Sequence, residues 1–232
     1  MTKQADLIDY IFEGHHSPLA AEMLRWMDAS VRATAFVDTY RDKIRKKIRV
    51  AGTPESLLDV RCELDVAFHL LADRRLALVY EPVASEKRRG PDFALTYRVN
   101  TSFNVEVARI RLEQAGAERI ARILLDKLGQ MQPGMPNMLV IQARQEVVQS
   151  VDLGQLLQGI KARAEAKDPG FYALTRYASP ADFYKDFLRL SGLVLWSTDE
   201  SAPGQLWINK QARPSLDEKV LRLVNTLLSG TK

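Results

Sequence analysis

The sequence has little of the chemistry on which several protein classes depend. Its 232 residues include a single cysteine, Cys62, which excludes an intramolecular disulfide and a cysteine-based metal cluster. The three histidines have no second ligand at metal-binding spacing. We find no phosphate-binding glycine motif, internal repeat or low-complexity tract. A globular protein of a reducing compartment is therefore expected.

Long apolar runs are also lacking. No stretch approaches the roughly 20 apolar residues that span a bilayer. The N-terminal segment carries acidic residues where a signal peptide would have its apolar core. We therefore expect no membrane partner and a cytoplasmic location. The formal net charge of +4 permits a polyanionic partner without requiring one.

The N-terminal part has helical periodicity. Ser17 followed by Pro18 predicts a helix start, and apolar residues at spacings of three to four continue the pattern to about Arg49. A second helix is expected over residues 54–73, capped by Thr53. We expect residues 1–52 to form a helical region packed on the core, and residues 53–232 to form an α/β domain with a C-terminal extension.

A basic run lies near the end of the first of these helices. It is either a solvated helix face or a surface that follows a phosphate backbone with salt-dependent affinity. The candidate nucleic-acid-binding residues are Arg41, Lys43, Arg45, Lys46, Lys47 and Arg49.

The middle of the chain predicts a sheet. β-branched and aromatic residues dominate segments 76–81, 92–99 and 102–110, and the short link at Asn100 and Thr101 predicts an antiparallel hairpin. A helix over 113–128 followed by a strand over 137–143 predicts a right-handed parallel crossover.

The C-terminal part adds further elements. Helices are expected at 153–166 and 181–190, strands at 192–197 and 205–209, and a capping box at 215–218 opens a last helix. The order of elements predicts the α/β or α+β class, with a mixed central sheet flanked by helices.

Two carboxylates in the hairpin point to a site. Asp92 begins the second strand, and Glu106 lies inside the third, toward the same end of the hairpin. Strand side chains alternate faces, so Glu106 shares a polar face with Asn104 and Ala108. Two adjacent carboxylates repel unless a cation lies between them, and Mg²⁺ or Mn²⁺ fits this role. Such an ion polarises a phosphodiester and activates water. The alternative is a turn residue at Asp92 and a half-exposed Glu106 paired with an arginine.

A third acidic residue precedes the hairpin. Glu63 lies beside the buried face of the expected helix 54–73, on the line of Val60 and Ala67. This position suits a further metal ligand or a water-holding group, although a solvated or arginine-paired Glu63 is the alternative.

The order of these residues resembles the PD-(D/E)xK nuclease superfamily, which has the restriction-endonuclease-like fold. The matching residues are Glu63, Pro91 with Asp92, and Glu106, and the resemblance covers roughly residues 55–143. It implies Mg²⁺-dependent phosphodiester hydrolysis, with Asp92 and Glu106 as metal ligands and Glu63 as a further acidic residue.

The sequence departs from the motif at its lysine, which is replaced by Ala108. Arg109 has the charge, but on a regular strand it points to the opposite face unless a bulge turns it. As a catalytic residue it would stabilise phosphate rather than act as a base. Other candidates for the missing cation lie on the crossover helix, and one supplementary polar residue lies on the fourth strand: Arg119, Arg122, Lys127 and Gln142.

Three functions stay open. The first is a nuclease acting on DNA or RNA with Mg²⁺ or Mn²⁺. The second, motivated by Ala108, is a catalytically inactive member of the same fold that binds nucleic acid or protein. The third is an interaction or assembly protein whose acidic residues are ordinary surface groups. A homodimer is compatible with all three.

Overall fold

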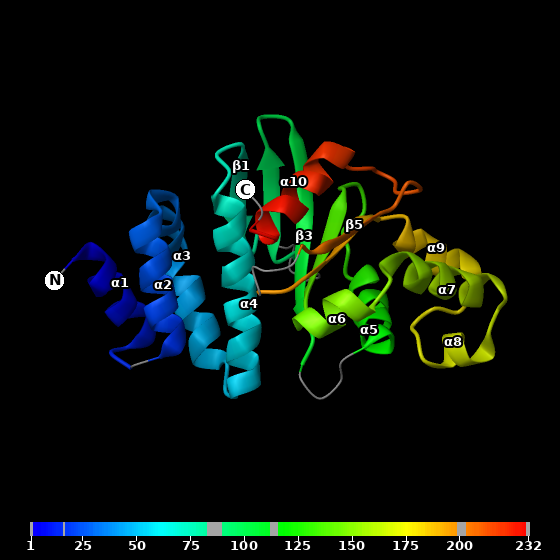
Figure 1. Cartoon of the computed structure of the whole chain (residues 1–232), viewed down its shortest axis with the longest axis horizontal. Coiled ribbons are helices and arrows are strands. Elements are labelled where there is room, and N and C mark those ends of the chain that lie inside the picture. The colour runs from blue at the N-terminus through cyan, green and yellow to red at the C-terminus, as the bar shows by residue number, and fades with distance from the viewer. Residues whose placement is uncertain (1, 16, 83–89, 112–115, 199–202, 231–232) are drawn as a thin grey trace. The chain divides into compact units, whose positions relative to one another are not determined.

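A computed structural model describes residues 2–15, 17–82, 90–111, 116–198 and 203–230 (Figure 1). The chain divides into two compact units, Met1–Arg74 and Arg75–Lys232. The first unit extends past residue 52 because the helix that follows packs against the one before it. Within the described ranges, no helix combines the length and apolar composition needed to cross a bilayer.

The first unit contains four helices, coloured blue to cyan in Figure 1: α1 (Lys3–Phe12), α2 (Pro18–Ala29), α3 (Val31–Val50) and α4 (Pro54–Leu71). Ser17 caps α2 and Thr53 caps α4, as predicted. The single helix expected over 18–49 is wrong, because Ser30 is extended and its side chain accepts a hydrogen bond from the Ala33 N–H. Ser30 therefore ends α2 and caps α3. Helix α1 was not expected.

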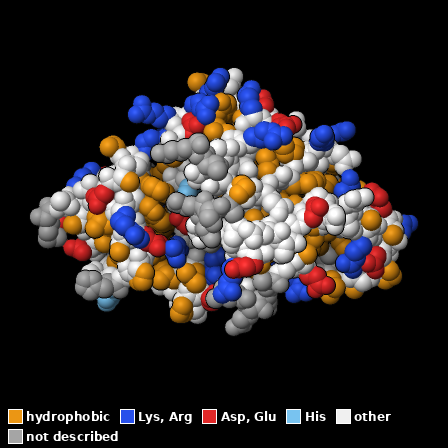
Figure 2. All heavy atoms as spheres, viewed as in Figure 1, with side chains coloured by type: hydrophobic (Ala, Val, Ile, Leu, Met, Phe, Trp, Pro, Cys, Tyr) orange, Lys and Arg blue, Asp and Glu red, His pale blue; other side chains and the backbone are white. Residues whose placement is uncertain are grey.

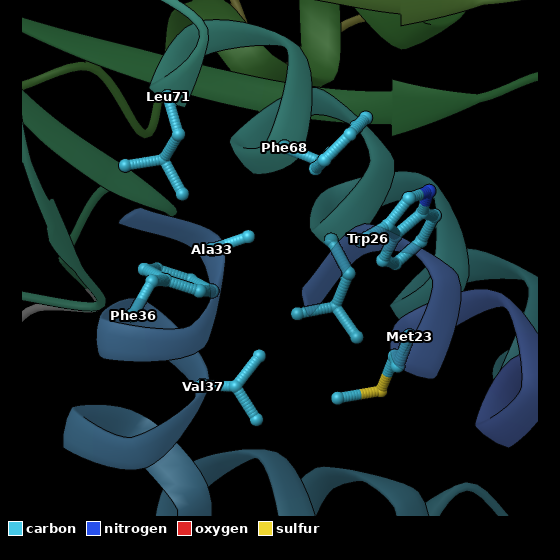
Figure 3. A pocket seen from close by; sticks show the side chains of 8 residues that line it. Met23, Trp26, Ala33, Phe36, Val37, Phe68 and Leu71 are labelled. Atoms are coloured by element: carbon cyan, nitrogen blue, oxygen red, sulfur yellow. The ribbon is translucent and has the colours of Figure 1, made fainter. Parts of the chain in front are cut away.

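The core of the first unit is formed by apolar side chains from α1, α2, α3 and α4. The Trp26 and Phe68 rings stack with their centroids 5.4 Å apart. Beside them lies an apolar cavity of about 10 Å³ (Figure 3). It is lined by Met23, Trp26, Ala33, Phe36, Val37, Leu64, Phe68 and Leu71. A space of this size without polar lining stays dry, so it is a packing defect rather than a ligand site.

The second unit contains a six-stranded sheet in the order β1-β2-β3-β4-β5-β6. The strands are β1 (Leu76–Tyr80), β2 (Phe93–Tyr97), β3 (Thr101–Arg109), β4 (Asn137–Gln142), β5 (Leu190–Trp196) and β6 (Gln205–Ile208). Pairing is parallel from β3 through β5 and antiparallel elsewhere. The mixed α/β class, the hairpin and the parallel crossover are thereby confirmed. The hairpin turn is longer than expected, because it contains residues 98–100, with Arg98 at φ 55°.

Six helices are described in the second unit: α5 (Ala117–Leu128), α6 (Gln145–Ser150), α7 (Leu153–Glu165), α8 (Pro169–Ala173), α9 (Pro180–Phe187) and α10 (Glu218–Leu228). The expected start of the crossover helix falls at 113–115, which lie outside the described residues. The expected box at 215–218 is wrong, because Asp217 is the N-cap and accepts from the Lys219 N–H. Helices α6 and α8 were not expected.

The two faces of the sheet differ in what covers them. Leu139 and Leu193 belong to a buried cluster with residues of α5, α6, α7, α8 and α9. The opposite face packs against α10 at Gly192. This position needs a glycine, because an added Cβ would lie 2.8 Å from Leu221 Cδ2 and 3.3 Å from the Trp207 carbonyl oxygen. Glu106 is in register with Leu139, so it lies on the face that α5 covers.

A buried carboxyl group lies in the first unit. Asp65 of α4 is 9% exposed. Burial raises the pKa of Asp65 from 3.8 to about 6, opposed by Arg61 and reinforced by the Glu22 carboxylate. Arg61 also pairs with Glu22 at 2.8 Å. The folded protein therefore holds a proton on Asp65 more tightly than the unfolded chain does. The resulting destabilisation is absent below about pH 4 and complete above about pH 6.

We expect Asp65→Asn to stabilise the protein at high pH. Removing the ionised carboxyl raises the free energy of unfolding by about 2 kcal/mol near pH 8 and leaves it almost unchanged near pH 4. Thermal unfolding followed by circular dichroism at both pH values measures this. The matched control is Asp28→Asn, at an exposed residue of α2. An equal gain at the two pH values would contradict the buried-charge explanation.

Candidate functional site

The register of the hairpin places Asp92 opposite Glu106. β2 and β3 pair Phe93 with Val105, and one further step of the antiparallel pairing reaches Asp92 and Glu106. Residues opposite each other in such a pair project from the same face. Both side chains are buried, with 4% of each residue exposed. The hairpin thus carries two buried carboxylates on one face.

The Asp92 carboxylate is held by the backbone of the neighbouring strand. Its Oδ2 accepts a hydrogen bond from the Val107 N–H at 2.8 Å. The Asp92 carbonyl oxygen accepts from the Glu81 N–H at 2.8 Å, which continues the β1–β2 pairing past the strand end. Side chain and backbone of Asp92 are therefore both fixed before any ligand arrives.

Lys127 supplies a positive charge to the site. Its Nζ lies 2.7 Å from Glu106 Oε2 and 3.7 Å from Asp92 Oδ2. The lysine side chain is 16% exposed. Ile123 and Leu124 are buried on the inner face of α5. Lys127 follows them by four and three residues, and residues at this spacing share a helix face, so the Lys127 side chain projects into the site. The crossover helix thus brings one ammonium group to both carboxylates.

An amide network continues the polar face into β4. The Asn104 Nδ2 donates to Asn137 Oδ1 at 3.2 Å, and both residues are at most 3% exposed. Asn137 Nδ2 in turn lies within 3.1 Å of the carbonyl oxygens of Gln132, Met135 and Arg189. These bonds fix the start of β4 beside β3. They give Glu106 a rigid polar neighbourhood on one side.

The Glu106 face changes character toward β1. On this face, the β1–β2 register pairs Val79 with Ala94, and the β2–β3 register pairs Thr96 with Ser102. Val79 is 47% exposed, and the Thr96 and Ser102 hydroxyls share a hydrogen bond of 3.1 Å. Small, partly exposed side chains therefore adjoin the two carboxylates. Glu106 lies at the border between this open part of the face and the part that the helices cover.

Arg109 and Gln142 are not brought to the carboxylates. The β3–β4 pairing is regular through Arg109, which is in register with Gln142. The bulge that would turn Arg109 toward Glu106 is therefore wrong for this segment. Alternation puts Arg109 and Gln142 on the face opposite Glu106.

The two arginines of α5 also differ from Lys127 in position. Arg122 is exposed. The Arg119 Nε is buried and, in the described part of the chain, has no hydrogen-bond partner. Arg119 precedes Lys127 by eight residues, about 12 Å along the helix axis. Of the cations considered on the crossover helix, Lys127 is the one that contacts Asp92 and Glu106. The feature of the sequence that could have identified Lys127 is its position beside the apolar stripe of an amphipathic helix.

Glu63 lies in the first unit, where it forms an ion pair with Lys47 of α3. The two side chains are 14% and 21% exposed, so the pair is largely shielded from water. The structure thus joins Glu63 to a member of the basic run rather than leaving it on an open helix face.

The rest of the basic run is partly neutralised within the first unit. Arg41 pairs with Asp38 at 3.0 Å, and Arg45 pairs with Glu13 at 2.8 Å. Lys43 Nζ lies 5.7 Å from the centroid of the Tyr40 ring, and the exposed residues Lys46 and Arg49 complete the run. On the face drawn in Figure 2, basic side chains are interspersed with acidic and hydrophobic ones. Local pairing therefore leaves less charge for a phosphate backbone than the sequence suggests.

Asp92 and Glu106 are the residues of the site that could hold a divalent ion. Carboxylate oxygens are the hard ligands that Mg²⁺ and Mn²⁺ prefer, and Mg²⁺ is commonly held by one or two carboxylates with waters completing its shell. Among the described residues, no group of three or more acidic, histidine or cysteine side chains is arranged as a metal site. The Lys127 ammonium lies in the space at the two carboxylates.

Comparisons of the chain with family models, curated proteins and solved structures give no match. The nuclease resemblance therefore depends on Asp92, Glu106 and their arrangement.

We expect Lys127→Met to destabilise the protein by about 3 kcal/mol, because it leaves two buried carboxylates without their ammonium. Adding Glu106→Gln restores part of this loss, since one negative charge is removed as well. Urea unfolding of the single and double variants measures both effects. Lys185→Met, at an exposed position of α9, is the matched control. If the double variant loses as much free energy of unfolding as the two single variants together, Lys127 and Glu106 are not coupled and the explanation is contradicted.

Proposed function

We propose that the protein is a divalent-metal-dependent phosphodiester hydrolase acting on nucleic acid. The observation that carries the proposal is the Lys127 ammonium, 2.7 Å from Glu106 and 3.7 Å from Asp92. Lys127 provides, from the crossover helix, the positive charge that is missing on β3 because Ala108 replaces the motif lysine. Two carboxylates and one lysine on a single face are the chemical groups that the PD-(D/E)xK resemblance implies.

Each residue has a distinct task in this proposal. Asp92 and Glu106 hold the ion, and the Val107 N–H keeps the Asp92 carboxylate in its orientation. A bound divalent ion polarises the phosphodiester and lowers the pKa of the attacking water. Lys127 contacts the phosphate and balances the negative charge that grows as water attacks. An ammonium group also differs from a guanidinium in that it is able to release a proton.

The neighbourhood of the site suits a chain-like substrate. The small, partly exposed side chains of Ala94 and Thr96 adjoin Asp92 along β2. The net charge of +4 is compatible with a polyanionic substrate.

A second candidate function is a binding module of the same fold without catalysis. Ala108 favours it, because the motif lysine is replaced on the strand itself. In this case Lys127 is a structural counter-ion. Such a protein binds nucleic acid with an affinity that falls with salt, and it cleaves nothing.

We expect Mn²⁺-dependent cleavage of labelled nucleic acid. Single- and double-stranded DNA and RNA are incubated with the wild type and with Asp92→Asn, Glu106→Gln and Lys127→Met, with Lys185→Met as the control. Each site variant should lower the rate by at least about 100-fold, as expected for groups acting in the transition state, while the control cleaves normally. Absence of cleavage by the wild type, with salt-sensitive binding retained, would favour the binding module. Equal cleavage by wild type and site variants would exclude this site.

A further inference from the structure

We propose that Lys127 is an internal counter-ion that competes with the divalent ion, so that the metal binds only when the ammonium leaves the carboxylates. The inference rests on the proposed metal site at Asp92 and Glu106, but not on cleavage. It makes Lys127 a regulator of metal occupancy in addition to a phosphate contact.

The geometry makes simultaneous occupancy unfavourable. Lys127 Nζ already lies 2.7 Å from Glu106 Oε2 and 3.7 Å from Asp92 Oδ2. A Mg²⁺ ion requires carboxylate oxygens at about 2.0–2.1 Å, in the same space. An ammonium and a divalent ion sharing these oxygens would repel each other at close range. One of the two cations therefore has to leave.

Burial makes this competition strong. Asp92 and Glu106 are each 4% exposed, and the Lys127 side chain is 16% exposed. Charges in such surroundings are weakly screened, so each cation changes the binding of the other more than it would at a surface. The counter-ion already stabilises the two carboxylates without metal, which lowers their affinity for the ion.

The lysine is able to leave without unfolding its helix. Lys127 lies in the last turn of α5, and its side chain is a flexible four-carbon stem ending in a point charge. A rotation about these bonds moves the ammonium away from Glu106 while the Lys127 backbone stays in place. A phosphate bound beside the metal offers the displaced ammonium a new anionic partner. Metal and substrate phosphate are then expected to bind cooperatively.

The test is Mn²⁺ binding, measured by isothermal titration and by the electron paramagnetic resonance signal of free Mn²⁺. The intact wild type is compared with Lys127→Met, Lys127→Arg and the control Lys185→Met. We expect Lys127→Met to bind Mn²⁺ at least tenfold more tightly, and Lys127→Arg and Lys185→Met to show no such gain. Unchanged or weaker binding by Lys127→Met would overturn the inference.

A measurement on the wild type removes the dependence on a variant that fails to fold. In protein labelled with ¹³C-lysine, the Lys127 Cε–Hε signal is assigned with Lys127→Arg and followed during a Mg²⁺ titration. Displacement predicts that this signal shifts as the site fills, while the Lys185 signal does not. A Lys127 signal that stays fixed at saturating Mg²⁺ would overturn the inference.

The outcomes separate this inference from the proposed function. Cleavage by the wild type without tighter Mn²⁺ binding by Lys127→Met leaves the function standing and removes the competition. A second outcome is that Lys127→Met binds Mn²⁺ more tightly, that adding Glu106→Gln abolishes this gain, and that the wild type cleaves nothing. This outcome supports the competition and removes the function. Absence of Mn²⁺ binding by every variant removes both.

Discussion

The second unit depends on one electrostatic constraint, which is that two carboxylates buried on adjoining strands need a cation between them. Asp92 and Glu106 are each 4% exposed, and the Lys127 ammonium lies within 3.7 Å of both. A buried carboxylate without such a partner becomes protonated or destabilises the fold. The position of α5 along β3 is therefore tied to the positions of the two acids. The hairpin and the crossover helix form one charged unit.

The topology explains why this unit forms where it does. β3 pairs antiparallel with β2 and parallel with β4, so it is the strand where the two halves of the sheet meet. A parallel connection requires a crossover, and α5 supplies it. β3 therefore has β2, which carries Asp92, as its hairpin partner on one side. It is also covered by α5, which carries Lys127. Glu106 lies where these two connections come together.

The sequence was sufficient to predict the acids but not their cation. The sequence placed Asp92 and Glu106 toward the same end of the hairpin, but their pairing depended on the turn, which contains residues 98–100 instead of the short link expected; the observed register puts the two acids opposite each other. The choice among Arg119, Arg122 and Lys127 depended on the rotation of α5 about its axis, which the packing of Ile120 and Leu124 on the sheet determines. Similarly, the apolar periodicity continues across Ser30, although serine favours a helix N-cap over a helix interior. Its extended backbone appears only in the structure.

Stability alone does not account for the charges on this face. Leu139 and Ile141 on the adjacent strand show that its environment accommodates apolar side chains, which pack there with α5. Replacing a buried ion pair by apolar residues of similar volume is often neutral or stabilising. A fold that needed only a packed interface would therefore have no use for two acids and a lysine at this point. The charged groups instead border the partly exposed side chains of β1 and β2, while Asp92 and Glu106 are themselves each 4% exposed. Retention of charge beside a partly exposed part of the sheet is the physical basis on which the proposal of a site at this place depends.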